Sequence, residues 1–286
     1  MLLQRIRKSV GRNGFRGFLR NLDRKAGIGR LEYLLATNWF NPFATLWLNF
    51  RSLPLPQAFL LPIWVYGRPR FYSLSGSIRI RGAVRPGMIQ FNPVRSGSPS
   101  VQSLQSELQN DGTIIFEGKG IIGTGTRIFV NTSAVLTIGD DFKIADMVNI
   151  GCMRSISIGK LARIPHRCQI FDSNYHYLAN FNKRAVPDRT YPIKIGQGCW
   201  LGNSSTVSGG ASIPDFTIVC SNSLVNKSIN DIPTHSLIGG IPAKLLTTGI
   251  KRVYSPELNN RISEFYHQHP GETYMMPDDM TMDDCI

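Results

Sequence analysis

A short polar run in the second half of the chain contains residue types that could perform acid–base chemistry. It reads Asp172-Ser173-Asn174-Tyr175-His176. The side chain of His176 suits a general base that activates a hydroxyl group, because the pKa of an imidazole lies near neutral pH. Asp172 or Asn174 could orient the ring by accepting its second N–H. Taken alone, a histidine in such a run is most often a solvated loop residue, so its place in the fold decides its meaning.

A period of six residues governs the stretch that follows, 195–229. A helix places apolar residues at i, i+3 and i+4 and a strand at every second position, so a period of six fits neither alone. It fits a coiling ribbon of short strands, in which each side of a coil drops one aliphatic side chain inward and turns a corner at a small residue, with coils pairing about 4.8 Å apart. The aliphatic positions are Ile195, Leu201, Val207, Ile213, Val219 and Val225, and the corner positions are Cys199, Ser205, Ala211, Thr217, Ser223 and Ile229.

The same period occurs earlier in the chain, with small changes of phase. Its largest break lies between Ile170 and Ile195, and the polar run with His176 falls inside that break. A solenoid loses its period where a loop leaves the stack, and loops carry functional sites. A second inserted loop is expected at 92–112, which is rich in polar residues, Pro and Gly. The earlier aliphatic or aromatic positions are Phe116, Ile122, Ile128, Ile138, Ile144, Ile150, Ile158, Ile164 and Ile170.

The charge of the chain is strongly positive and unevenly distributed. The formal net charge is +13. The length of 286 residues is sufficient for one long solenoid domain with additions at its ends. Residues 1–30 hold nine Lys and Arg against one Asp, whereas residues 271–286 hold five acidic residues and no basic one. The basic middle suits an anionic ligand such as coenzyme A or a nucleotide- or lipid-linked sugar. Nucleic acid is not expected as a partner, because no nucleic-acid-binding motif accompanies the charge.

The cysteines do not form a metal-binding or disulfide pattern. There are five of them, without a C-x-x-C pair. Cys168 and Cys199 fall on corner positions of the six-residue period, and Cys220 falls next to one, so we interpret them as small buried residues. Free thiols suit a reducing compartment, and the basic N-terminus lacks the continuous apolar core of a signal peptide. We therefore expect a cytoplasmic protein, with peripheral contact to the inner face of the membrane as an option.

Residues 4–25 are expected to form a basic amphipathic helix, which is weakened by three glycines. The aromatic stretch 33–66 follows, with three of the four tryptophans. Asn and Pro residues interrupt it, so we do not expect it to span a membrane. It could seal the open end of the solenoid, or it could contact the membrane surface as part of residues 1–66. The two interpretations are compatible, and the sequence leaves both open.

The end of the chain has clear helix signals. Residues 255–267 are predicted to form a helix, with Ser255 as its N-cap and Pro256 at its first position. Its apolar stripe is expected to lie against the coils, and the acidic tail after it is expected to be mobile. The stripe consists of Leu258, Ile262 and Phe265.

These patterns resemble the hexapeptide repeat of the left-handed β-helix acyltransferases, which reads roughly aliphatic-Gly-x-x-small-x. The sequence CWLG at 199–202 and the closing segment HSLIGGIPAKLL at 235–246 are similar to further motifs of this family. The greatest similarity is to coenzyme-A-dependent sugar O-acetyltransferases, including galactoside, maltose, capsule and O-antigen enzymes. The left hand of the helix is implied by this resemblance alone, since parallel crossovers are generally right-handed.

The resemblance implies an all-β fold with three segments. Residues 1–75 form an N-terminal helical and aromatic cap or membrane-surface segment, 76–248 the left-handed parallel β-helix, and 249–286 a C-terminal helix and acidic tail. We expect a homotrimer, because the flat faces of a three-sided prism suit a closed ring. In the family the active site lies in the groove between neighbouring subunits.

The resemblance also implies roles for individual residues. His176 matches the family's catalytic histidine in its D-x-[DN]-x-H-like setting, with direct transfer and no acyl-enzyme. Trp200, which should point outward because Cys199 occupies the corner, would line the acceptor or thioester site. Either Asp146 or Asn149 would contact the acceptor. The residues that would bind acetyl-coenzyme A are Trp200, Gly202, Asn203, Ser221, Asn226, Lys227 and Lys244.

The resulting hypothesis is an acetyl-CoA-dependent O-acetyltransferase that acts on a sugar hydroxyl of a surface polysaccharide, such as a capsule or O-antigen, or on its precursor. An N-acyltransferase acting on an amino sugar or amino acid, and a non-catalytic β-helix scaffold, are the alternatives. No metal is expected, because a metal-dependent anhydrase on this fold needs three histidines, and only His166 and His176 lie near the coils.

Overall fold

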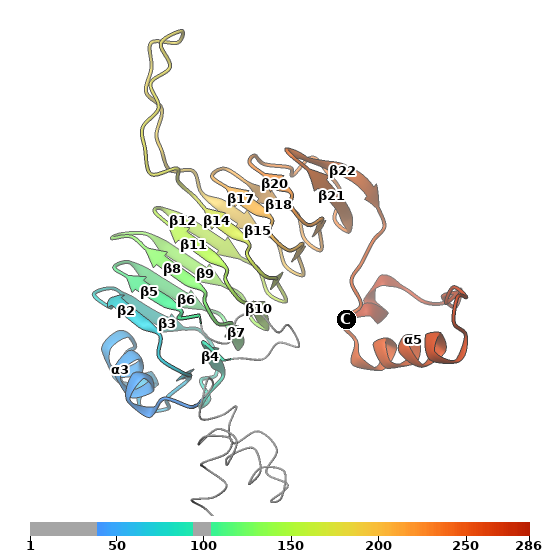
Figure 1. Cartoon of the computed structure of the whole chain (residues 1–286), viewed down its shortest axis with the longest axis horizontal. Coiled ribbons are helices and arrows are strands. Elements are labelled where there is room, and N and C mark those ends of the chain that lie inside the picture. Colours follow the sequence, from blue (N-terminus) through green and yellow to red (C-terminus); the bar gives the residue numbers. More distant parts are fainter. Residues whose placement is uncertain (1–38, 94–103) are drawn as a thin grey trace, which may run out of the picture.

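The chain winds into a three-sided prism of short strands. The computed structural model describes residues 39–93 and 104–286. Figure 1 shows the coils stacked between helix α3 (Pro42–Ser52) at one end and a hairpin of β21 (Ser236–Gly240) and β22 (Ala243–Thr248) at the other. All strand pairs in the described residues are parallel except this hairpin. The predicted left-handed parallel β-helix, with helices at its ends, is confirmed in its architecture.

Three sheets form the sides of the prism, and successive strands step from one sheet to the next. The first sheet contains β1 (Ile63–Val65), β4 (Ile89–Phe91), β7 (Gly120–Ile122), β10 (Phe142–Ile144), β13 (Arg163–Ile164), β16 (Trp200–Leu201), β19 (Ile218–Val219), β21 and β22. The second contains β2 (Arg70–Ser73), β5 (Glu107–Asn110), β8 (Arg127–Val130), β11 (Asn149–Cys152), β14 (Gln169–Phe171), β17 (Thr206–Ser208) and β20 (Leu224–Val225). The third contains β3 (Ser77–Ile80), β6 (Thr113–Phe116), β9 (Val135–Ile138), β12 (Ser155–Ile158), β15 (Ile193–Ile195) and β18 (Ser212–Ile213).

The six-residue period builds the core of the prism. Its six aliphatic positions between Ile195 and Val225 are each at most 1% exposed. Residues at equivalent positions stack between coils, as where Ile150 pairs with Ile128 on one side and with Ile170 on the other. The narrow axis accepts one such side chain per side of each coil, so the period of six is the sequence signature of this packing.

Helix α3 and the short helix α4 (Leu55–Ala58) seal the N-terminal end of the prism. β1 and β3 are edge strands, and an open sheet edge leaves backbone groups unpaired. Asn49 supplies those partners for β1, since its Nδ2 donates to Ile63 O (2.7 Å) and its Oδ1 accepts from Ile63 N (3.1 Å). Gln57 does the same for β3, donating to Ile80 O (2.7 Å) and accepting from Ile80 N (3.2 Å). The capping role predicted for this aromatic stretch is confirmed.

The C-terminal helix forms where the sequence predicts it, but it does not lie on the coils. α5 (Pro256–Gln268) begins after its N-cap Ser255, whose side chain accepts from Leu258 N. Figure 1 shows α5 separated from the solenoid, and Leu258 is its one buried residue. The prediction that its apolar stripe packs on the coils is wrong, because the chain beyond the helix folds back over it and packs Tyr274 edge to face against Phe265 (ring centroids 5.3 Å apart).

The acidic tail is also more ordered than predicted. It ends in a 3₁₀ helix, η1 (Met282–Cys285), whose N-cap Thr281 forms a capping box with Asp284. Cys285 is buried, and its carbonyl accepts from Tyr254 N (2.6 Å) and Ser255 N (3.0 Å). These bonds tie the end of the chain to the start of α5, so the expected mobile tail is instead folded.

Two boundaries differ from those expected. The solenoid begins before residue 76, because β1 and β2 already pair with the next coil. The loop expected at 92–112 is shorter at its C-terminal side, since β5 begins at Glu107. The helix expected at 4–25 lies outside the described residues. None of the described helices is long and apolar enough to cross a membrane.

Candidate functional site

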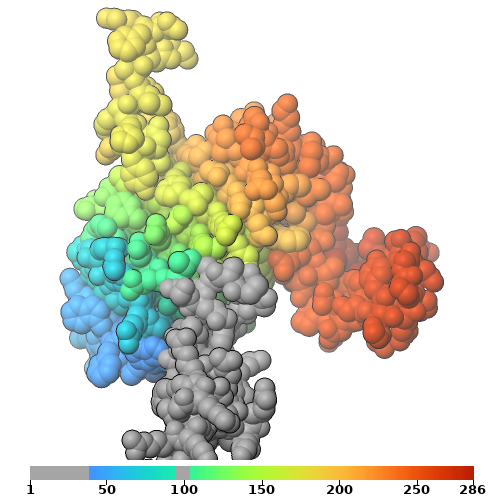
Figure 2. All heavy atoms as spheres, in the orientation of Figure 1, coloured from blue at the N-terminus to red at the C-terminus, as the bar shows by residue number. Residues whose placement is uncertain are grey.

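The largest break in the period forms a long projecting loop, here called the arm (residues 172–192). It leaves the second sheet after β14 and returns to the third sheet at β15. Facing residues bridge its two sides in antiparallel fashion, Ser173 with Thr190 and Asn180 with Ala185. Figure 2 shows the arm standing clear of the solenoid body. The loop predicted at this break is confirmed, and it has the form of a narrow finger.

Asp172 anchors the base of the arm. Its side chain is completely buried. Oδ1 accepts from Met153 N (2.7 Å), and Oδ2 accepts from Arg154 N (2.8 Å) and Ser155 N (2.7 Å). A carboxylate that accepts three backbone N–H groups binds firmly to the turn that supplies them. The structure therefore gives Asp172 the task of tying the arm to the preceding coil.

His176 lies on the exposed part of the arm. Its backbone N–H donates to Asn174 Oδ1 (3.3 Å), so Asn174 shapes the turn that carries it. Within the described residues no hydrogen bond joins the imidazole ring to Asp172 or Asn174. The predicted role of these two side chains in orienting the ring is thus not formed in a single chain.

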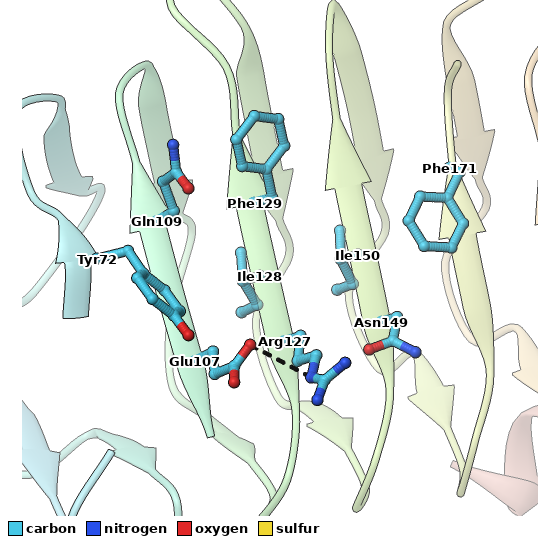
Figure 3. Close-up of a pocket in the computed structure, with 9 residues that line it drawn as sticks. All are labelled: Tyr72, Glu107, Gln109, Arg127, Ile128, Phe129, Asn149, Ile150 and Phe171. Carbon is cyan, nitrogen blue, oxygen red and sulfur yellow. Dashed lines mark ion pairs between the residues drawn. The ribbon is translucent and has the colours of Figure 1, made fainter. Parts of the chain in front are cut away.

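A depression of ≈ 350 Å³ lies on the outer face of the second sheet, beside the base of the arm. Figure 3 shows its lining, with aromatic rings and polar side chains projecting from successive strands. Arg127 pairs with Glu107 (Nε to Oε2, 3.3 Å), and Asn149 donates to Gln169 Oε1 (3.1 Å). Polar groups between aromatic rings are what a sugar-binding surface uses. The lining residues are Tyr72, Glu107, Gln109, Arg127, Ile128, Phe129, Asn149, Ile150 and Phe171.

The two candidates for acceptor contact lie in different surroundings. Asn149 is a lining residue of the depression on the second sheet. Asp146 is buried at the preceding corner, where Oδ1 accepts from Thr124 N (3.0 Å) and Oδ2 lies 3.8 Å from His166 Nδ1. Asn149 is therefore the more accessible of the two, whereas Asp146 is occupied in holding the corner.

Trp200 points outward from the first sheet, as predicted, and is 38% exposed. The segment after β22 crosses it, so that the Arg252 guanidinium lies 4.7 Å from the centre of the indole ring. Lys251 lies in the same way over Phe216, at 4.7 Å. Tyr254 continues the contact by donating its hydroxyl to Gly198 O (2.9 Å). We call residues 250–255 the strap, and the sequence analysis did not anticipate it.

The predicted cofactor-binding residues are divided between two corners of the prism and the terminal hairpin. Gly202, Asn203 and Ser221 lie at the corner between the first and second sheets. The arm leaves at the next corner, between the second and third sheets, and there Asn226 and Lys227 lie two coils further on.

The corner residues beside the first sheet are well placed for a ligand along the prism edge. Asn203 and Ser221 are exposed, and Asn222 N donates to Asn203 O (2.9 Å) as the corners stack. Lys244 is exposed on β22. One chain thus does not bring His176 together with Trp200 or Asn203. His176 lies on the arm, whereas Trp200 and Asn203 lie on the first sheet and at its corner with the second sheet.

The cysteines nearest the site are unsuited to act as nucleophiles. Burial raises the pKa of the Cys152 thiol to about 12, with a further rise from the charge of Asp172. Burial likewise raises the pKa of Cys168 to about 11 and of Cys199 to about 12. A thiolate is the reactive form, so these thiols are inert at neutral pH. Cys168 and Cys199 are buried as predicted, and Cys220 is half-buried.

The described part of the chain contains no group of three or more His, Cys, Asp and Glu residues arranged to hold a metal ion. His166 and Asp146 form a pair at one corner, with 3.8 Å between Nδ1 and Oδ2, without a third such residue in the described ranges.

Known proteins with similar sequences are acetyltransferases. No protein-family profile matches the chain. A candidate lipopolysaccharide biosynthesis O-acetyl transferase of Escherichia coli strain K12, WbbJ, is 29% identical over 147 residues, which are 49% of this chain and 74% of that protein. A candidate colanic acid biosynthesis acetyltransferase of the same strain, WcaF, is 31% identical over 112 residues, which are 39% of this chain and 57% of that protein. The galactoside O-acetyltransferase of that strain is 27% identical over 77 residues, 27% of this chain and 32% of that protein.

Solved structures of similar shape are more distant. The polysialic acid O-acetyltransferase OatWY is 17% identical with a TM-score of 0.40, covering 70% of this chain and 100% of that chain. AntD, an N-acyltransferase from Bacillus cereus in complex with dTDP and 3-hydroxybutyryl-CoA, is 14% identical with a TM-score of 0.36, covering 72% of this chain and 88% of that chain. The sequence relatives confirm the resemblance to sugar O-acetyltransferases and the prediction of an acyltransferase.

Proposed function

We propose that this protein is an acetyl-CoA-dependent O-acetyltransferase that modifies a sugar hydroxyl of a surface polysaccharide or its precursor. The observation that carries the proposal is the arm, which breaks the repeat at the segment that contains His176 and leaves the second sheet directly after Phe171, a lining residue of the depression of aromatic and polar side chains. The names of the WbbJ and WcaF relatives, which refer to lipopolysaccharide and colanic acid biosynthesis, support this class of acceptor. We place the reaction in the cytoplasm, where acetyl-CoA is made and free thiols persist.

The chemistry is a direct transfer. His176 accepts the proton of the sugar hydroxyl as that oxygen attacks the thioester carbonyl of acetyl-CoA. A backbone N–H at a nearby corner stabilises the oxyanion of the tetrahedral intermediate. The carbon–sulfur bond then breaks, and the proton returns from His176 to the departing coenzyme A sulfur. The thiols of Cys152, Cys168 and Cys199 take no part, because they are buried and protonated.

The active site is shared between neighbouring copies in a homotrimer. Within one chain His176 lies on a different edge of the prism from Trp200 and Asn203. The arm also exposes large apolar side chains that a neighbour would cover, with exposed fractions between 59% and 77%. A ring of three prisms would let the arm of one copy reach the first-sheet edge of the next. The large apolar side chains that the arm exposes in this range are Tyr177, Leu178, Phe181 and Val186.

Each substrate then has its own surface. The acceptor sugar lies in the depression on the second sheet, where Asn149 donates and accepts hydrogen bonds and Phe129 and Phe171 stack on sugar faces. The pantetheine arm of coenzyme A follows the stacked corners with Gly202, Asn203 and Ser221. We assign Lys244, which is exposed on β22, to its phosphates, whereas Lys227 lies at the corner from which the arm leaves.

Activity measurements test the proposal. Purified protein is incubated with acetyl-CoA and a panel of oligosaccharides, and the release of free coenzyme A thiol is followed. We expect release that depends on a sugar, and a product whose acetyl group hydroxylamine removes, as it does from esters. The His176→Ala protein should lose about 10²–10⁴ in kcat with little change in acetyl-CoA affinity. A hydroxylamine-resistant product would indicate an amine acceptor, and full activity of the variant would exclude His176 as the base.

A further inference from the structure

The cap at the N-terminal end of the prism has a second face that the solenoid does not use. α3 turns Leu48, Thr45 and Asn49 toward the first strand, and these side chains are buried. On the other side of the cap, seven large apolar side chains are at least 39% exposed, and we call this set the aromatic face. It consists of Phe43, Leu46, Trp47, Phe50, Leu55, Phe59 and Leu60.

The exposure of this face is high for a water-soluble surface. Phe43 is 81% exposed, Phe59 72% and Trp47 60%. Phe50 and Phe59 meet edge to face (ring centroids 5.2 Å apart), so the residues of both helices form one surface. Contiguous apolar patches on a protein surface mark sites of interaction with another protein or with a membrane.

The charge around the aromatic face selects between those partners. Residues 39–93 contain six arginines, no lysine and no acidic residue. All six arginine side chains are exposed, and Arg51 lies on α3 itself. Arg81 pairs with Glu117 of the next coil (2.8 Å), whereas Arg51 shares α3 with the aromatic face. A face of Phe, Trp and Leu with a cationic group on the same helix, in a segment without acidic residues, complements a bilayer of anionic lipids. A protein partner of ordinary composition would not require this complete absence of acidic groups.

We propose that the aromatic face is a docking surface for an anionic lipid bilayer. Phe43, Trp47 and Phe59 insert among the headgroups, and Arg51 contacts lipid phosphates. The face lies at one end of the prism, remote from the terminal hairpin (Figure 1). In a trimer built around an axis parallel to the prism, three such faces would point the same way, and the three weak contacts would reinforce one another. The arm leaves the prism four coils beyond the first coil. At the spacing of paired strands, its base is therefore about 19 Å from the first coil along the prism axis.

Vesicle binding tests this proposal without any need for the acceptor sugar. The full-length protein is sedimented with vesicles of phosphatidylcholine alone, and with vesicles that also contain phosphatidylglycerol. We expect binding to the second kind only, with a blue shift of tryptophan emission as Trp47 enters the interface. The Phe43→Ser, Trp47→Ser double variant should bind the anionic vesicles at least about tenfold more weakly, because two inserted side chains are lost. Its activity on a soluble acceptor should stay unchanged.

A matched control is the Met275→Ser, Met276→Ser double variant, which removes two equally exposed apolar side chains near α5 (79% and 69% exposed) and should bind vesicles like the unmodified protein. Unchanged vesicle binding by the Phe43, Trp47 variant would overturn the proposal, since another part of the chain would then carry the contact. Failure of the unmodified protein to bind either vesicle would overturn it as well. A change in oligomeric state of the Phe43, Trp47 variant without lipid would show that the face contacts protein instead.

Discussion

Asp172 is the residue on which the position of the arm depends. Its carboxylate is buried and accepts three backbone N–H groups from Met153, Arg154 and Ser155. Those groups lie 17 to 19 residues earlier, on the preceding coil. Asp172 thus affects the position of His176 indirectly. Its carboxylate ties the arm to the solenoid and does not contact the imidazole.

Replacing Asp172 by Asn tests this role. An amide oxygen in the place of Oδ2 can still accept from Arg154 N and Ser155 N, but the amide NH2 then faces Met153 N, which loses its acceptor, and all three bonds lose the help of the negative charge. We expect the free energy of unfolding to fall by about 2–4 kcal/mol, measured by urea denaturation. Asp188→Asn is the control, because Asp188 is exposed and pairs with Arg154 at 3.6 Å on the surface. Equal stability of the two variants would show that the buried carboxylate does not anchor the arm.

The buried thiols predict a loss of stability in alkali. Burial raises the pKa of Cys199 from 9.0 to about 12. Above pH 9 the unfolded thiol ionises while the folded thiol keeps its proton, so the folded state binds more protons and becomes less stable as the pH rises. The expected slope is about 1.4 kcal/mol per pH unit for each such thiol between these two pKa values.

Cys199→Ala isolates that contribution. The variant should be less stable than the unmodified protein at pH 8, because a buried side chain is shortened, yet its stability should fall less steeply from pH 9 upward. Turnover should persist, since the thiol is no nucleophile in the proposed reaction. Parallel denaturation curves across this pH range, or loss of all turnover in a folded variant, would contradict the interpretation.

At the scale of elements, the arm and the coils follow from the sequence more directly than the contacts between distant segments do. The period between Ile195 and Val225 predicts flat sides of six residues with one aliphatic side chain each, and three such sides per coil are implied by the resemblance. The break after Ile170 predicts the arm. The strap could not be predicted in this way, since the segment after β22 has no repeat that sets where Arg252 meets Trp200. The same holds for α5, whose stripe finds its partner, Tyr274, in the tail rather than in the coils.

Part of the candidate site escaped prediction for a related reason. Repeat positions predict whether a side chain points in or out, and Trp200 does point outward. They do not predict which of two neighbouring polar side chains already forms hydrogen bonds within the fold. Asp146 and Asn149 are three residues apart, and only the corner contact with Thr124 shows that Asp146 has a structural task. The Asp172 contacts likewise depend on the turn of the previous coil, which no local pattern encodes.

The arm itself predicts an effect on assembly. Leu178 is 64% exposed and Phe181 77% exposed, so a neighbouring copy would bury both in the proposed trimer. The Leu178→Ser, Phe181→Ser double variant should dissociate at protein concentrations at least about tenfold higher than the unmodified trimer, because two buried apolar contacts are lost. Light scattering across a dilution series measures this. The Phe43→Ser, Trp47→Ser protein serves as the control and should assemble normally.

At the scale of the whole molecule, a single prism separates groups that one reaction would require together. His176 extends from the corner between the second and third sheets, whereas Asn203 lies at the corner between the first and second. The central claim of the proposed function is therefore that each active site is completed by two copies of the chain. In that case an inactive arm and an inactive corner placed on different copies should compensate for one another.

Mixing two inactive proteins measures this most directly. One carries His176→Ala, and the other carries Asn203→Trp, which fills the exposed corner proposed for pantetheine; light scattering first confirms that both form trimers. The two are unfolded, combined in equal amounts and refolded, and coenzyme A thiol release is recorded. The mixture should recover about a quarter of the unmodified rate, because about one site in four then combines an intact arm with an intact corner. A mixture no more active than the two variants assayed separately would contradict a shared active site.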